Sequence, residues 1–219
     1  MELGPLVADF KPPPHPKGIS LYRKLVQLVP MKAEEHAEAL FEANQLDTEG
    51  TNWAYLSYGP FADLKCYHFW VRENQGLDDP VFLAIVVKES GRPLGIASYL
   101  RIHPAEGSIE VGHIHFSPLL QLTTSATESM FLMMQWVFEA GYRRYEWKCN
   151  ALNQASRSAA QRLGFSFEGI FRQMMIVKGR NRDTAWFAAI DSEWPALKTA
   201  FERYLDEKNF EKEGRPVTS

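Results

Sequence analysis

A polar turn that opens directly onto a helix is the clearest candidate binding site in the sequence. The turn covers residues 121–127, and an apolar helical pattern follows from Met130. A helix start collects unpaired backbone N–H groups and the positive end of the helix dipole, which together favour a phosphate or pyrophosphate. We therefore expect an anion site built by Gln121, Leu122, Thr123, Thr124, Ser125, Ala126 and Thr127.

Four short motifs follow the turn in a fixed order. They are residues 141–149 (GYRRYEWKC), Asn153-x-x-Ser156, Leu163-Gly164-Phe165 and Glu168-Gly169. Together with the turn, their order and spacing over residues 80–190 resembles the GNAT superfamily of acyl-CoA-dependent N-acyltransferases. Within it they resemble the RimJ/RimL-like branch, which includes the enzymes that acetylate the N-termini of ribosomal proteins.

The turn departs at one position from the family pattern Gln/Arg-x-x-Gly-x-Gly/Ala. Gln121 and Ala126 match the two ends, but Thr124 stands where the middle glycine is expected. The loop must therefore do without a positive φ at this residue or tolerate some strain.

The resemblance implies the reaction and its cosubstrate. It implies an N-acetyltransferase, without a metal, that moves the acetyl group of acetyl-CoA directly to a primary amine of a protein N-terminus, an amino acid or a small amine. In the family the strand before the turn splays from its neighbour and pairs with the pantetheine arm, which adds Phe116 and Ser117 to the cofactor site. A backbone N–H near them would polarise the thioester carbonyl. Asn153 would bind the pantetheine arm, and Ser156 would act as the general acid on the departing thiolate.

Transfer to an amine also needs a base, and Glu110 is the first candidate. An α-amine has a pKa of about 8 and is partly neutral at neutral pH, so that a weak base suffices. Glu110 lies on the strand before the turn. Partial burial beside Ile114 and Phe116 would raise its pKa toward the useful range.

His113 and His115 are rival bases, because a histidine pKa lies naturally near neutrality. Strand alternation places both histidines on the opposite face from Glu110. A bulge at Gly112 would reverse this phase, and glycine inside a strand often marks a bulge.

Alternating strands and helices must position these groups. Apolar runs and turn residues predict strands at 21–28, 81–87, 94–101 and 108–117, and helices at 32–44 and 127–140. The resemblance implies an α/β (α+β) fold with a mixed, mostly antiparallel central sheet, one splayed pair of strands and flanking helices. We expect a Pro-rich arm at 1–20, a single acyltransferase domain at 21–205 and a charged tail at 206–219.

An aromatic-rich segment lies between the first helix and the strand at 81–87. In the resembling family this region borders the acceptor pocket. Trp53, Tyr55 and Tyr58 are therefore the candidate substrate-binding residues.

Composition limits the partners. The chain has 219 residues, 45% of them hydrophobic, with a formal net charge of −3, which argues against a nucleic-acid-coating protein. Cys66 and Cys149 form no ligand or disulfide pattern. No apolar run approaches the roughly 20 residues of a membrane span, and the first residues lack a signal-peptide pattern. We expect a cytoplasmic monomer or homodimer without nucleic-acid or membrane partners.

Two other functions are compatible with the same residues. The missing glycine at Thr124 keeps open a non-catalytic CoA-binding or regulatory module. The Pro-rich arm and the aromatic segment could instead bind a partner chain.

Overall fold

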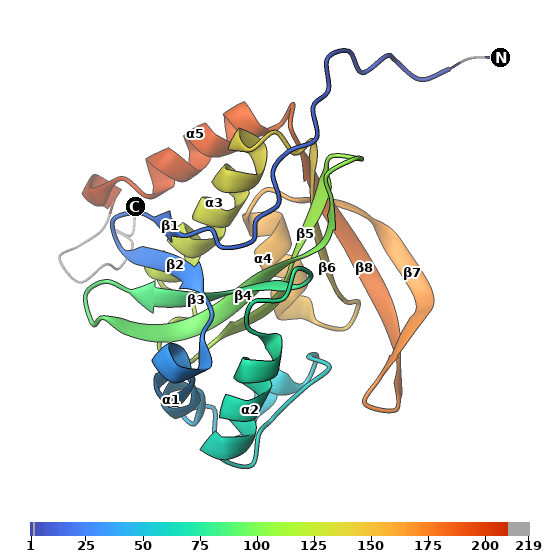
Figure 1. Ribbon diagram of the computed structural model, residues 1–219. Coiled ribbons are helices and arrows are strands. Elements are labelled where there is room, and N and C mark those ends of the chain that lie inside the picture. The colour runs from blue at the N-terminus through green and yellow to red at the C-terminus, as the bar shows by residue number, and fades with distance from the viewer. Residues whose placement is uncertain (2, 210–219) are drawn as a thin grey trace.

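The structure is a computed structural model that describes Met1 and residues 3–209. In this part of the chain eight strands form one sheet in the order β1-β2-β3-β4-β5-β6-β8-β7 (Figure 1). Neighbouring strands are antiparallel, except that β5 and β6 are parallel. The strands are β1 (Leu21–Tyr22), β2 (Val26–Pro30), β3 (Val81–Val87), β4 (Arg92–His103), β5 (Ser108–Phe116), β6 (Arg144–Asn150), β7 (Ser166–Val177) and β8 (Arg180–Ile190).

Helices cover both faces of this sheet. Helices α3, α4 and α5 pack on one face, and α1 and α2 pack together on the other (Figure 1). No helix in the described chain is long and apolar enough to cross a membrane. The helices are α1 (Ala33–Asn44), α2 (Leu64–Asn74), α3 (Thr124–Glu139), α4 (Gln154–Arg162) and α5 (Trp194–Tyr204), with short 3₁₀ turns η1 (Thr51–Trp53) and η2 (Glu207–Asn209).

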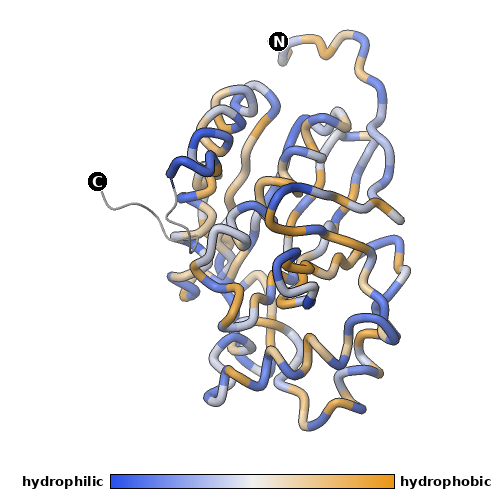
Figure 2. Tube along the Cα trace, turned by 90° about the vertical axis from the view of Figure 1, so that its left-hand side faces the viewer, coloured by the Kyte–Doolittle hydropathy of each residue, from blue (hydrophilic) through white to orange (hydrophobic). Residues whose placement is uncertain are grey.

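Each face of the sheet has its own hydrophobic cluster. The apolar run of β3 serves both, because successive strand residues point to opposite faces. Leu83 and Ile85 join the larger cluster under α3, and Phe82 joins the smaller cluster under α1 and α2. Hydrophobic and hydrophilic residues are interspersed along the chain trace (Figure 2). The expected mixed, mostly antiparallel sheet flanked by helices is confirmed.

Strands β5 and β6 separate halfway along their length. They pair only from Ser108 to Val111 on β5 and from Arg144 to Trp147 on β6. Beyond these residues the two backbones diverge, which is the splayed pair implied by the resemblance. The gap between them becomes the site.

A bulge follows Gly112 on β5. Gly112 pairs with Ser98 and His115 with Ile96, so two residues of β5 stand opposite one residue of β4. His113 takes a left-handed φ of 50° at this point. A Cβ on Gly112 would stand 2.9 Å from Leu100 Cδ2, so any larger residue would require the Leu100 side chain to shift. The bulge reverses the strand phase that the sequence predicts.

Several element boundaries differ from the expected ones. The expected strand at 21–28 is two short strands joined by a turn, and α3 begins at Thr124 rather than Thr127. Helix α2 was hidden in the aromatic segment, although Asp63 caps it by accepting from the Cys66 N–H at 2.7 Å.

Part of the expected N-terminal arm packs on the domain. The Met1 end of the arm extends away from the body (Figure 1). Pro13 and Pro16 are buried, and Pro14 C=O accepts a hydrogen bond from the Tyr142 hydroxyl at 3.1 Å. The second half of the expected arm therefore packs on the domain. Of the expected tail at 206–219, residues 210–219 lie outside the described residues, and the three boundaries 1–20, 21–205 and 206–219 stay predictions.

Candidate active site

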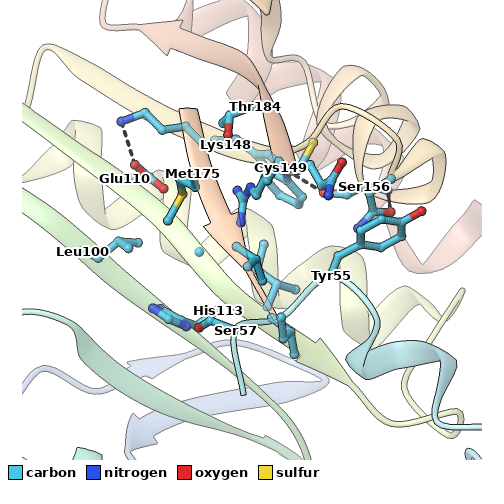
Figure 3. A pocket seen from close by; sticks show the side chains of 18 of the residues that line it. Tyr55, Ser57, Leu100, Glu110, His113, Lys148, Cys149, Ser156, Met175 and Thr184 are labelled. Carbon is cyan, nitrogen blue, oxygen red and sulfur yellow. Dashed lines mark hydrogen bonds and ion pairs between the residues drawn. The ribbon is translucent and has the colours of Figure 1, made fainter. Parts of the chain in front are cut away.

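A cavity of ≈ 350 Å³ lies in the gap between β5 and β6 (Figure 3). It reaches both faces of the sheet, because the two strands no longer pair there. On β6, Trp147 and Cys149 face the cluster under α3, whereas Lys148 faces the opposite side. The lining includes Asn52, Tyr55, Ser57, Leu100, Arg101, Glu110, Gly112, His113, Trp147, Lys148, Cys149, Asn153, Ser156, Met174, Met175, Arg182, Thr184 and Trp186.

Asn153 and Ser156 occupy one side of the cavity, at the start of α4. Asn153 is the N-cap, and its Oδ1 accepts from the Ser156 N–H at 3.0 Å. The Ser156 hydroxyl accepts from the indole Nε1 of Trp147 at 3.0 Å. Because the hydroxyl oxygen accepts from this donor, its own proton points to another acceptor at the cavity, and Cys149 Sγ is one such acceptor. The geometry suits a group that gives a proton away.

Cys149 lies beside Ser156 on the same side. Burial raises the pKa of its thiol, and a hydrogen bond with the Ser156 hydroxyl opposes that effect. The raised pKa keeps the group a thiol near neutral pH, and a thiol is a much poorer nucleophile than a thiolate.

Glu110 lies on the other side of the cavity and is paired with two cations. Its Oε2 is 2.8 Å from Arg101 Nη1 and 2.8 Å from Lys148 Nζ (Figure 3 marks the Lys148 contact). Burial raises the pKa of the Glu110 carboxyl, and Lys148 and Arg101 oppose the rise. Both ion pairs use Oε2, while Oε1 lies 3.7 Å from the position that a Cβ on Gly112 would take. The second carboxylate oxygen therefore lies on the side of Gly112, which also lines the cavity.

The bulge brings His113 and His115 to the same face as Glu110, so the prediction that they lie opposite is wrong. His113 lines the cavity and contacts the rings of Tyr58 and Phe82. His115 stacks on Trp53 at a centroid distance of 3.8 Å and does not line the cavity. Burial lowers the pKa of each histidine to about 4, so both are neutral at neutral pH.

The three candidate substrate-binding aromatic residues do not lie together at the cavity. Tyr55 lines the cavity and closes one rim by donating its hydroxyl to Leu152 C=O at 3.2 Å. Trp53 and Tyr58 lie behind the wall, in the cluster under α1 and α2. They support the two histidines and do not line the cavity.

The turn before α3 has the form of a capped helix start. The Thr123 hydroxyl accepts from the Ala126 N–H at 3.1 Å, which leaves Thr124, Ser125, Ala126 and Thr127 in the first turn. The left-handed residue is Leu122, with a φ of 59° and a fully exposed side chain. Thr124 adopts the helical conformation and therefore needs no glycine.

Gln121 holds the end of β5 in place. Its Nε2 donates to Phe116 C=O at 3.0 Å and to Asn52 Oδ1 at 2.8 Å. The Ser117 N–H donates to Leu94 C=O at 3.0 Å, away from the gap. Successive residues of an antiparallel strand turn their backbone groups to opposite edges, so Phe116 faces the gap. Of the two expected backbone sites, Phe116 is the one placed for a ligand.

Arg162 adds a cation to the start of α3. It belongs to the last turn of α4, and its Nη1 donates to the Thr127 hydroxyl at 3.3 Å. The side chain is exposed. The anion site suggested by the turn thus has a positive side chain beside it, which no motif in the sequence indicates.

Four further charged or aromatic groups of the cavity were not singled out from the sequence. Arg101, Lys148, Arg182 and Trp186 come from three different strands and meet only in the folded sheet. Alternation along β6 was the one available signal, since Lys148 falls on the opposite face from Trp147 and Cys149.

The family follows from a direct comparison. A family model described as an acetyltransferase (GNAT) domain matches residues 26–166. The chain belongs to the GNAT acetyltransferase family. The match includes β4, β5, β6 and α4, which contribute to the cavity of this GNAT domain, and the turn before α3. No curated protein sequence matches the chain.

Solved structures agree with this assignment. A GCN5-related N-acetyltransferase from Brucella melitensis is 43% identical, with a TM-score of 0.94 and 97% of each chain covered. A probable GNAT-family acetyltransferase from Chromobacterium violaceum ATCC 12472 is 39% identical, with a TM-score of 0.83, covering 89% of this chain and 98% of that one. The microcin C7 self-immunity acetyltransferase MccE, solved with acetyl-CoA and AMP, shares the fold at 18% identity, with a TM-score of 0.67 and coverage of 77% and 93%.

Proposed function

We propose that the protein is an N-acetyltransferase that moves the acetyl group of acetyl-CoA directly to a primary amine. One observation carries the proposal: a single cavity passes through the gap between β5 and β6 and is lined by both Ser156 and Glu110. The family uses acetyl-CoA, so the gap would hold the pantetheine arm, with Asn153 and the Phe116 backbone beside it.

The two polar residues take opposite proton roles. The C–N bond forms as the C–S bond breaks, so one proton leaves the amine and one reaches the thiolate. Glu110 receives the amine proton, directly or through a water molecule, at the oxygen not paired with Arg101 and Lys148. Ser156 gives its proton to the thiolate, while Trp147 holds the hydroxyl oxygen in place.

Direct transfer of the acetyl group is consistent with a protonated thiol at Cys149. A route through an acetylated enzyme would need a thiolate at this position, and burial of Cys149 favours the thiol. Cys149 then serves as an apolar wall next to the reacting sulfur. Steady-state kinetics with two varied substrates tests the route, because direct transfer gives intersecting lines and an acetyl-enzyme gives parallel ones.

The phosphates of CoA would lie at the start of α3. The first-turn N–H groups, the helix dipole and Arg162 all favour negative charge there. Tyr55 borders the acceptor side. The RimJ/RimL-like assignment, the cytoplasmic location and the monomeric or dimeric state stay predictions that rest on the sequence.

Paired binding and turnover measurements test the function. We expect CoA and acetyl-CoA to bind with measurable heat, and acetyl-CoA to release free thiol when a suitable amine is added. Ser156→Ala should lower kcat about 10²-fold with an unchanged dissociation constant for acetyl-CoA. Ser158→Ala is the matched control on the exposed side of the same helix. Binding without turnover for any amine would favour a CoA-binding module, and no binding at all would remove both hypotheses.

A further inference from the structure

Arg182 lies in the wall of the cavity and has no carboxylate within ion-pair distance among the described residues. It lies on β8, opposite Met175 of β7, and its side chain makes no hydrogen bond or ion pair within residues 1 and 3–209. Its Nε atom is buried and unpartnered. Burial lowers the pKa of Arg182, yet a guanidinium stays protonated at neutral pH.

The charged groups near it are linked by ion pairs. Lys148 is shared between Glu110 and Glu146, at 2.8 and 2.7 Å. Arg101 pairs with Glu110, and Arg144 pairs with Glu146 and with Glu168 of β7. These three cations and three carboxylates form a neutral chain, with neutral His113 next to it. Asp79, whose carboxylate accepts from the N–H groups of Arg101 and Ile102 at 3.1 Å, adds a fourth negative charge. Arg182 is thus the cation of this group that forms no ion pair with a carboxylate among the described residues.

Two more side chains of β8 also have a buried hydrogen-bonding group without a partner among the described residues. Thr184 and Trp186 follow Arg182 at alternate positions of the strand, and all three line the cavity. The Thr184 hydroxyl and the Trp186 indole N–H are also buried without a partner among the described residues. A buried donor without a partner is costly, so such groups are expected to be paired in the working state.

We infer that this strip of β8 binds an oxyanion, a carboxylate or a phosphate, carried by the amine acceptor. The inference rests on the proposed function and names its substrate class. Guanidinium, hydroxyl and indole N–H are all hydrogen-bond donors, and an oxyanion offers several acceptor lone pairs at once. The positive charge of Arg182 would also repel polyamines and amino-bearing antibiotics of high positive charge. The acceptor therefore combines an amine, placed near Glu110, with a negative group, placed near Arg182.

A panel of matched amines tests the inference. The carboxylate arm compares L-alanine with L-alaninamide, and the phosphate arm compares O-phosphoethanolamine with ethanolamine, with spermidine as the polycation. We expect kcat/KM to be at least about 30-fold higher for one oxyanion-bearing member than for its neutral partner. Alaninamide has the less basic amine and so more neutral amine near pH 7.5, and basicity alone would favour it over alanine. A preference for alanine therefore reports recognition of the carboxylate.

Variants of the strip complete the test. Arg182→Gln should raise KM for the oxyanion-bearing amine about 30-fold or more and leave the neutral partner unchanged, and Arg182→Lys should restore part of the loss. Arg180→Gln, at an exposed residue two positions earlier on β8, is the matched control.

Titration with CoA shows separately whether each variant is folded and binds the cosubstrate. An enzyme that binds CoA but acetylates neutral amines or spermidine as well as the oxyanion-bearing ones, or none of them, contradicts the inference while leaving CoA binding intact. Absence of CoA binding in the unmodified protein would instead remove the proposed function and this inference with it.

Discussion

The indole Nε1 of Trp147 lies 3.0 Å from the hydroxyl oxygen of Ser156, and this contact joins the last residue of β6 that pairs with β5 to the start of α4. It fixes the hydroxyl as an acceptor toward Trp147 and therefore as a donor toward the cavity. The serine thus depends on the tryptophan for its orientation.

Trp147→Phe removes this hydrogen bond and keeps most of the packing. Because the serine proton would no longer be held toward the cavity, we expect kcat to fall about 10-fold, less than the fall for Ser156→Ala. The double variant should be no slower than Ser156→Ala, since the two residues act through one proton. Stopped assays of thiol release measure kcat, and calorimetric titration measures the dissociation constant for acetyl-CoA. Additive losses in the double variant would contradict the link.

Glu110→Gln tests the base through the pH profile. A base works only when unprotonated, so activity rises as the pH passes upward through its pKa. Burial raises the pKa of Glu110, which places the acidic limb above the range of an ordinary glutamate. We expect Glu110→Gln to remove this limb and to cost about 10²–10⁴ in kcat/KM at neutral pH, with recovery at high pH where the amine deprotonates unaided.

Glu146→Gln is the control for that experiment, because it also takes one carboxylate away from Lys148 but does not line the cavity. Its profile should keep the acidic limb. His113 is the rival base, and its pKa of about 4 would place the limb near that pH. An unchanged limb in Glu110→Gln beside a collapsed rate in His113→Gln would assign the proton to the histidine.

Leu122 and Thr124 should respond oppositely to glycine. Leu122 has the left-handed φ, which glycine adopts without a steric penalty, so Leu122→Gly should keep or slightly raise the melting temperature. Thr124 is buried in the first turn of α3, where glycine has a helix propensity lower than that of threonine by about 0.3 kcal/mol and also loses the packing of the side chain. Thermal unfolding followed by circular dichroism measures both. A lower melting temperature for Leu122→Gly than for Thr124→Gly would show that the strain has been misplaced.

Arg162→Gln should weaken CoA binding through the phosphates. The side chain lies beside the first turn of α3, so we expect a dissociation constant about 3- to 10-fold higher at low salt, with the difference shrinking as salt screens the charge. Arg172→Gln, on exposed β7, is the control. Equal binding by Arg162→Gln and the parent protein at low salt would place the phosphates elsewhere.

The fold could be predicted further than the site. The strand at 81–87 appears at its predicted ends, because a short, continuous apolar run between turn residues is typical of a strand buried on both faces. The helix at 64–74 was missed, since its aromatic residues obscure the helical period, and only Asp63 marked its start. The first strand was predicted as one element because the turn after Tyr22 carries no glycine or proline.

The site depends on contacts that no local pattern contains. The His113 side chain lies on the face opposite to the predicted one, because the bulge after Gly112 shifts every later residue of β5 to the other face. The pairing of Glu110 with Lys148 joins residues of two strands, and Arg182 comes from a third. The roles given to Glu110, Ser156, Asn153 and the turn at 121–127 stay predictions until they are measured.

The most direct test is the release of free thiol from acetyl-CoA in the presence and absence of an amine, with the amine analysed by mass spectrometry. Alanine, O-phosphoethanolamine, a peptide N-terminus and their neutral or blocked counterparts would form the acceptor set. The account predicts that thiol appears in step with an N-acetylated product, and that Ser156→Ala slows both while Ser158→Ala slows neither. Thiol release that is independent of every amine, or that persists unchanged in Ser156→Ala, would contradict it.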